Sequence, residues 1–248
     1  MALYVNGEKV CISKKVTSAS GVGIPKTLTN GVLTPSTTFS LPTGASDLAP
    51  KVLYEAFART PITSVNFSSL IRITGYQALS STFSSCTSLT SVDFSSLTTV
   101  TGDWALEFAF SSCTSLSSIS FPVLQTIGLN SSSGSCGEFN GTFNNCTRLT
   151  SLSFPELTEI YSTSYYDEYS FTFALNNKVQ KMYFPKLHTI TYGQGASDQD
   201  GAKNVFYGCS SLTELHFGVA NQAAIEASPG YSTAWGRGAG NVTIYFDL

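Results

Sequence analysis

Side chains that could carry out acid–base, nucleophilic or metal chemistry are few in this sequence, and they form no recognisable catalytic motif. The two histidines, His188 and His216, do not lie at a motif spacing from a nucleophilic serine or cysteine. Asp167 and Glu168 are adjacent carboxylates that could do acid–base work in a glycosidase, but adjacent carboxylates in a polar segment are more often solvated. The segment 198–201 resembles the start of a calcium loop without its bidentate glutamate. The sequence therefore predicts a protein that is not an enzyme and has no cofactor or metal ion.

The cysteines are the other candidates for chemistry, and four of the six share one position of a repeat. Those four are Cys86, Cys113, Cys146 and Cys209, whereas Cys11 and Cys136 lie outside the repeat. Side chains at one repeat position point the same way, so their Cβ vectors run parallel and do not face each other as a disulfide requires. No CxxC pair or Cys/His spacing indicates zinc. We expect the four to be buried free thiols that act as small apolar side chains.

The repeat connects these cysteines to the apolar residues around them. Its pattern is Phe-x-x-Cys-x-x-Leu-x-x-Val-x-Phe-x-x-Leu-x-x-Val, as at Phe83, Cys86, Leu89, Val92, Phe94, Leu97 and Val100. The pattern returns in full at 110–127 and 143–160, and less completely at 57–73, 173–190 and 206–217. Fixed internal repetition predicts a solenoid in which each repeat packs on its neighbours.

Each copy contains one segment with the alternation of a half-buried strand. Val92 and Phe94 are apolar, with polar residues on either side of Val92, which is the period of a strand. One strand of this length cannot bury its apolar face alone, but stacked copies can. The repeat therefore predicts a parallel ladder, with the opening Phe and the Cys in stacked columns inside.

This pattern resembles the bacterial leucine-rich repeats of the BspA type, on the residues of 110–127 and 143–160. The resemblance spans roughly residues 57–217. It implies an α+β repeat solenoid, a leucine-rich repeat with one short parallel strand per repeat and atypical N- and C-terminal caps. Members of the family are often surface or secreted adhesins that bind host or cell-surface molecules. The resemblance therefore suggests a cell-surface or extracellular location and a function in recognition.

The pattern divides the chain into three regions. Residues 1–50 form an N-terminal cap with a β-hairpin at Asn6-Gly7, 51–218 an array of about six repeats, and 219–248 a C-terminal cap. Within them we expect a short helix from Pro50 to Phe57, another over 221–227, and a final strand over 241–246. Residues 1–50 could instead be a small separate module, and that alternative stays open.

Composition excludes some classes of partner. Charged residues make up 12% of the chain and the net charge is -3, against about 25% charged residues in ordinary soluble domains. Nucleic acids and anionic membranes both require a basic face, so we expect neither as a partner. No window approaches the roughly 20 apolar residues of a membrane span, and the start lacks the features of a signal peptide. The compartment and any export route stay open.

Two surfaces are candidates for binding. The first is the outward face of the strands, where two columns run through the repeats: Ser64, Ser91, Ser118, Ser151, Lys181 and Glu214, and beside them Asn66, Asp93, Ser120, Ser153, Tyr183 and His216. Only the last two repeats place large side chains there, namely Lys181, Tyr183, Glu214 and His216. The second is the set of insertions between repeats, where binding sites often collect, above all the one with Tyr165, Tyr166 and Tyr169. Tyrosine is favoured in binding loops, although these rings could also pack on the solenoid.

The sequence favours a non-enzymatic recognition or adhesion module that binds a protein or a cell-surface glycan. One alternative is a structural component of a phage or surface assembly, in which the chain associates with itself. Another is a carbohydrate-active enzyme on a parallel β-helix. A single obvious strand per repeat argues against the enzyme, since a β-helix coil would show several. The oligomeric state and the ligand stay open.

Overall fold

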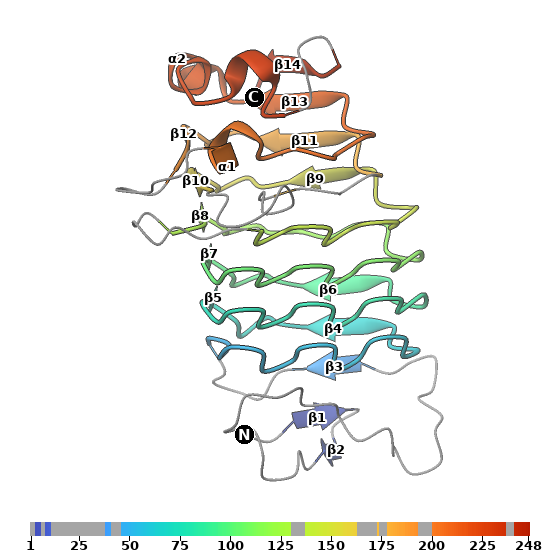
Figure 1. Cartoon of the computed structure of the whole chain (residues 1–248). Helices are drawn as coiled ribbons and strands as arrows, with labels where there is room; N and C mark the ends of the chain where they lie inside the picture. The colour runs from blue at the N-terminus through green and yellow to red at the C-terminus, as the bar shows by residue number, and fades with distance from the viewer. Residues whose placement is uncertain are drawn as a thin grey trace.

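The chain folds into a solenoid whose coils stack from β3 (Thr38–Ser40) near the N-terminal end to β14 (Thr243–Phe246) at the C-terminal end (Figure 1). The computed structural model describes residues 3–5, 8–10, 38–40, 46–129, 137–162, 173, 178–192, 200–236 and 241–248. Each regular coil has two short strands and a row of turns. The predicted repeat solenoid is confirmed.

The first side of the solenoid is a ladder of short parallel strands, which we call the front ladder. Its members are β3, β4 (Ser64–Asn66), β6 (Ser91–Asp93), β9 (Ser151–Ser153), β11 (Lys181–Phe184), β13 (Glu214–Phe217) and β14. In the coil between β6 and β9, Ser120 makes a single parallel bridge to Asp93. The alternation of polar and apolar residues produces these strands: Val92 is buried between exposed Ser91 and Asp93.

The second side is another parallel ladder, which we call the side ladder, and the single strand expected per repeat is therefore wrong. Its strands are β5 (Arg72–Ile73), β7 (Thr99–Val100), β8 (Thr126–Ile127), β10 (Glu159–Tyr161) and β12 (Thr189–Thr191). They are formed by the closing Leu-x-x-Val/Ile of the repeat. An apolar pair three residues apart shows no period of two, and each strand has only two or three residues. Hydrogen bonds from the neighbouring coils define these strands, so the pattern within one repeat does not reveal them.

The third side is a row of turns in which backbone N–H groups alternate between two kinds of partner. Leu79 and Ser81 donate to the carbonyls of Ala105 and Glu107 in the next coil, 2.8 Å away in each case. Ser80, between them, donates to a carbonyl three residues back at 3.2 Å. The coils above and below therefore satisfy backbone groups that a buried turn would otherwise leave unpaired.

The helix expected from Pro50 to Phe57 is wrong, because this segment belongs to the row of turns. Lys51 and Glu55 have φ angles of 53° and 52°, and a left-handed residue at every fourth position prevents an α-helix. Helix is confined to α1 (Asp200–Lys203), α2 (Gln222–Glu226), η1 (Val219–Asn221) and η2 (Tyr231–Thr233) in the part of the chain that the structure describes. The label α+β is therefore loose, while α2 confirms the helix predicted over 221–227.

Two columns of stacked phenylalanine rings fill the core. The column behind the front ladder consists of Phe67, Phe94, Phe121, Phe154, Phe184, Phe217 and Phe246, with neighbouring centroids 5.2–5.9 Å apart. The opening Phe of each repeat forms the second column, in which Phe83 stacks on Phe57 and Phe110 at 5.5 and 5.6 Å. Interior rings such as Phe94 and Phe83 are therefore sandwiched by the equivalent rings of the coils on either side.

The repeat cysteines form a third internal column, and they are hydrogen-bond donors as well as small apolar groups. All four are buried free thiols, as predicted. Each Sγ lies close to the carbonyl of the opening Phe of the preceding repeat, as between Cys113 and Phe83 at 3.2 Å and between Cys146 and Phe110 at 3.0 Å. Cys11 and Cys136 lie outside the described residues. The column ties each coil to the one before it.

The two ends of the array are closed by different structural elements. β1 (Leu3–Val5) and β2 (Glu8–Val10) pair antiparallel, as expected for the predicted hairpin, and β1 also pairs antiparallel with β3. At the other end, Trp235 is fully buried against Phe206 and Phe217, the last opening Phe and a late member of the front column. The predicted final strand is present as β14, which pairs parallel with β13. The division into regions at 50 and 218 stays a prediction.

Candidate binding surface

The outward face of the front ladder has the two columns that the repeat predicts. Lys181 lies in register with Ser151 on one side and Glu214 on the other, and Tyr183 lies in register with Ser153 and His216. The four predicted residues Lys181, Tyr183, Glu214 and His216 therefore lie together on β11 and β13. The earlier coils present only small polar side chains at the same positions: Asn66, Asp93 and serines, of which all but the half-buried Ser64 are exposed. The face therefore changes character between β9 and β11.

Three rings stack along one of these columns. The centroids of Tyr183 and His216 are 4.7 Å apart with planes inclined by 22°, and those of His216 and Tyr245 are 4.7 Å apart with planes inclined by 12°. This spacing matches the roughly 4.8 Å between neighbouring strands, because residues in register project side by side. We call Tyr183, His216 and Tyr245 the ring stack. Tyr245 was not predicted as a site residue, because β14 lies outside the repeat pattern and the sequence gave it no register.

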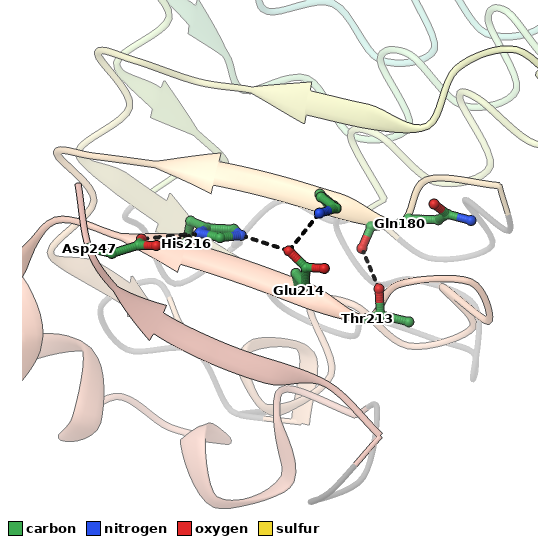
Figure 2. Close-up of polar contacts among 6 residues, drawn as sticks. Gln180, Thr213, Glu214, His216 and Asp247 are labelled. Carbon is green, nitrogen blue, oxygen red and sulfur yellow. Dashed lines mark hydrogen bonds and ion pairs between the residues drawn. The ribbon is translucent and has the colours of Figure 1, made fainter.

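Charged groups connect along the edges of the ring stack. Figure 2 shows the His216 ring between Glu214 and Asp247, with Nε2 3.1 Å from Glu214 Oε2 and Nδ1 3.0 Å from Asp247 Oδ1. Lys181 Nζ lies 2.9 Å from the same Glu214 oxygen. Carboxylate oxygens only accept hydrogen bonds, so the imidazole donates to both only when both of its nitrogens are protonated. Asp247 was also missed, since it follows the last strand.

The contact between Lys181 and Glu214 favours the charged form of both side chains. The hydrogen bond from Lys181, and after it the one shared with His216, lowers the pKa of Glu214 below its usual value. The same contact with Glu214 raises the pKa of Lys181. Both groups therefore stay ionised near neutral pH.

The network resembles part of a catalytic triad but lacks a nucleophile. Asp247 faces one nitrogen of His216, as the orienting carboxylate of a triad does, but the other nitrogen faces Glu214. In the described part of the chain no serine, threonine or cysteine hydrogen-bonds to this ring.

The other candidate residues are less informative. Tyr165, Tyr166 and Tyr169 lie outside the described residues, and so does the pair Asp167 and Glu168. His188 lies apart from the network, with Nδ1 3.0 Å from the Thr189 hydroxyl. Within the ranges described, no three His, Cys, Asp or Glu side chains are placed to hold a metal ion, and no helix is long and apolar enough to cross a bilayer.

The stacked coils, the paired ladders and the internal Phe and Cys columns define a leucine-rich repeat solenoid. Residues 45–138 and 124–227 match the BspA type Leucine rich repeat region, in six copies. The chain belongs to this family. The expectation of one strand per repeat therefore no longer separates this fold from a β-helix, and the family match assigns the repeat class instead. No curated protein matches the chain at a significant level.

Two solved structures are similar to the chain. One is a leucine rich cell surface protein from Faecalibacterium prausnitzii A2-165, with 18% identity and a TM-score of 0.36 over 78% of this chain and 35% of that one. Another is a leucine-rich repeat protein from Bacteroides ovatus ATCC 8483, with 14% identity and a TM-score of 0.27 over 73% of this chain and 63% of that one. The chain thus spans less than two thirds of either protein.

Proposed function

We propose that this chain is a non-enzymatic recognition or adhesion module that binds a protein or cell-surface glycan through the last coils of the front ladder. The observation that supports this most is the change along one face, from small polar side chains in the earlier coils to Lys181, Tyr183, Glu214 and His216 in the last ones. Serine hydroxyls that water already satisfies gain little on contact, whereas the residues that carry most binding energy at interfaces are enriched in tyrosine and depleted in serine. The family resemblance favours a cell-surface or extracellular location.

Preorganisation supports the same proposal. The ring stack and the contacts of Glu214 with Lys181 and His216 hold these side chains in one arrangement before a ligand arrives. A ligand then does not have to immobilise them, which would otherwise cost about 0.5–1.5 kcal/mol for each flexible side chain. An isolated exposed lysine or tyrosine would not have this advantage.

The insertion with Tyr165, Tyr166 and Tyr169 is a second part of the proposed binding site. It follows β10, the side-ladder strand of the coil that precedes β11. Three tyrosines within five residues, next to Ser, Asp and Glu, offer flat surface with hydrogen-bonding tips. We expect this segment to add binding energy to that of the front ladder.

The proposal is tested by changing the late coils into copies of the early ones. Lys181→Ser, Tyr183→Ser, Glu214→Ser and His216→Ser together reproduce the serine columns, and we call the result the four-serine variant. Both proteins are applied to printed arrays of extracellular proteins and glycans, and their melting temperatures are compared. The proposal expects saturable binding by the native chain and at least about tenfold weaker binding, or 1.4 kcal/mol, by the folded variant. Equal binding by both proteins would refute this assignment of the surface.

A second candidate function is that of a structural component of a larger assembly. β14 is the last strand of the front ladder in the described structure, and an unpaired strand edge can template pairing with another chain. Val219 and Leu248 are 58% and 47% exposed at the same end and are joined by a backbone hydrogen bond of 3.2 Å. Light scattering at rising concentration distinguishes the two functions, since an assembly component grows in mass and a monomeric receptor does not.

A further inference from the structure

The ring stack ends abruptly on one side. One face of Tyr183 lies against His216 on β13, and the residue in register on its other side, on β9, is Ser153. Ser153 is exposed, and its repeat position is filled by Ser120 and Asp93 in the two preceding coils. Among the described residues no ring covers the Tyr183 face that is turned toward β9. A further ring stacked on this face would lie about 4.8 Å beyond Tyr183, above Ser153.

We propose that this position, which we call the ring slot, binds a neutral pyranose ring of a glycan. The inference deepens the proposed function and rests on it. A pyranose is a saturated ring in a chair form, and the C–H groups on one of its faces have a small positive charge that fits the negative face of an aromatic ring. The Tyr183 face supplies that partner, at the distance at which the rings of the stack already pack on each other.

The floor of the slot suits the hydroxyl groups of a sugar. Ser151 and Ser153 on β9, and Ser120 in the preceding coil, present exposed hydroxyls, each of which can donate one hydrogen bond and accept others. The exposed carboxylate of Asp93 adds an acceptor one coil further on, although its Oδ1 already accepts from the Ser95 N–H at 2.8 Å. Sugar hydroxyls also both donate and accept, so the two surfaces are complementary.

The same floor disfavours other ligands. Among the described residues it has no apolar side chain against which a leucine or an aromatic residue of a protein could be desolvated, and such contacts dominate protein interfaces. The same described residues offer no free cation for a sulfate or a carboxylate, because Lys181 at the border is paired with Glu214 at 2.9 Å. A neutral sugar therefore fits the slot better than a peptide or an acidic glycan.

The other end of the ring stack is the natural comparison. Tyr245 is 38% exposed and its strand, β14, is the last of the ladder. No further strand provides a floor beyond it in the described structure. Tyr183 and Tyr245 therefore each have one face without a ring neighbour among the described residues, but only Tyr183 has hydroxyls beneath that face. A sugar that needs both contacts will use Tyr183.

The slot is tested with neutral hexasaccharides of glucose, mannose, galactose and N-acetylglucosamine, titrated into the native chain by calorimetry. We expect at least one to bind with a Kd at or below about 1 mM. Tyr183→Ala should weaken that binding at least about tenfold, while Tyr183→Phe, which keeps the ring, and Tyr245→Ala should each stay within about threefold. Ser153→Tyr should abolish binding although it leaves Tyr183 in place, because its ring would occupy the slot and extend the stack.

Two results would overturn the inference. One is that no neutral oligosaccharide binds the native chain, and the other is that binding survives in Ser153→Tyr with an unchanged melting temperature. If no neutral oligosaccharide binds but a protein ligand from the arrays loses affinity in the four-serine variant, the glycan slot fails while the recognition function stands. If neither variant alters the binding of any ligand, both proposals fail.

Discussion

Replacing Phe121 by alanine should cost a large part of the stability of the solenoid. The Phe121 side chain is fully buried in the column behind the front ladder. Its ring stacks on Phe94 and on Phe154, with centroids 5.3 Å apart in both cases, and meets Phe139 edge-on at 5.5 Å. The substitution therefore removes apolar burial and three aromatic pairs at once.

The structure sets the size of the effect. Phe→Ala in a core costs about 3–5 kcal/mol, and the value depends on how far the neighbours can collapse into the space. Here the coils above and below are held at fixed spacing by backbone hydrogen bonds, so collapse is limited and we expect about 4–5 kcal/mol. Phe246→Ala should cost less, because that ring is only partly buried and its one described ring contact is with Phe217.

The measurement is urea unfolding followed by circular dichroism and by tryptophan fluorescence, because a repeat array can unfold in parts and the two probes must agree. Ser120→Ala is the matched control. Ser120 is exposed one position before Phe121, so its loss should stay within about 0.5 kcal/mol. Similar losses for the two variants would show that the strand register is wrong.

Four further predictions concern the turns, the thiols and the insertion. Gly141 has φ of +57°, and a Cβ there would lie 2.3 Å from the Phe108 ring, so Gly141→Ala should lower the melting temperature. Ser112 also has a positive φ, 60°, so Ser112→Gly should be neutral or stabilising. The thiols of Cys86, Cys113, Cys146 and Cys209 should resist iodoacetamide in the native chain and all react in denaturant, and a Cys113–Cys146 disulfide in a mass spectrum would contradict this. Burial raises the pKa of the Cys146 thiol from 9.0 to about 12. The contribution of this thiol to the free energy of unfolding is therefore complete below about pH 9 and should be lost as the pH rises from there through 12. Urea midpoints that do not change over this range would refute the burial argument. Tyr165→Ser, Tyr166→Ser and Tyr169→Ser together should weaken ligand binding at least about tenfold with the melting temperature held, and a collapse of that temperature would mean that the rings are packing residues.

Much of the fold could be predicted because the repeat itself encodes it. Equivalent residues such as Phe94 and Phe121 recur at one position, and stacking follows once each copy must bury its apolar face on the next. The front ladder, the Phe columns and the buried thiols all follow from that single regularity. The register of the repeat also predicts that Tyr183 lies beside His216.

The features that sequence reasoning missed depend on contacts between coils. Two-residue strands such as Thr99–Val100 exist only because neighbouring coils supply their hydrogen bonds. The alternating N–H groups of the turn row likewise have partners in the next coil, so a local helix signal at Pro50 was misleading. The hydrogen bond from the Cys113 thiol to the Phe83 carbonyl is another example. A repeated Cys is equally compatible with a small apolar residue that makes no hydrogen bond.

The binding surface was predicted only in part for a similar reason. Lys181, Tyr183, Glu214 and His216 lie within the repeat, so their columns could be counted from the sequence. Tyr245 and Asp247 come after the repeat has ended, and only the pairing of β14 with β13 places them beside His216.

Hydroxyl-radical footprinting tests the proposed binding surface most directly, because it reads the side chains themselves. The chain is oxidised with and without a saturating array ligand, and each residue is quantified by mass spectrometry. Tyr76 and Tyr207, which belong to the turn row and are 44% and 40% exposed, serve as internal references. We predict that the ligand protects Tyr183 and His216 and leaves both references unchanged. Protection of Tyr76 or Tyr207, with Tyr183 and His216 oxidised as before, would contradict recognition through the front ladder.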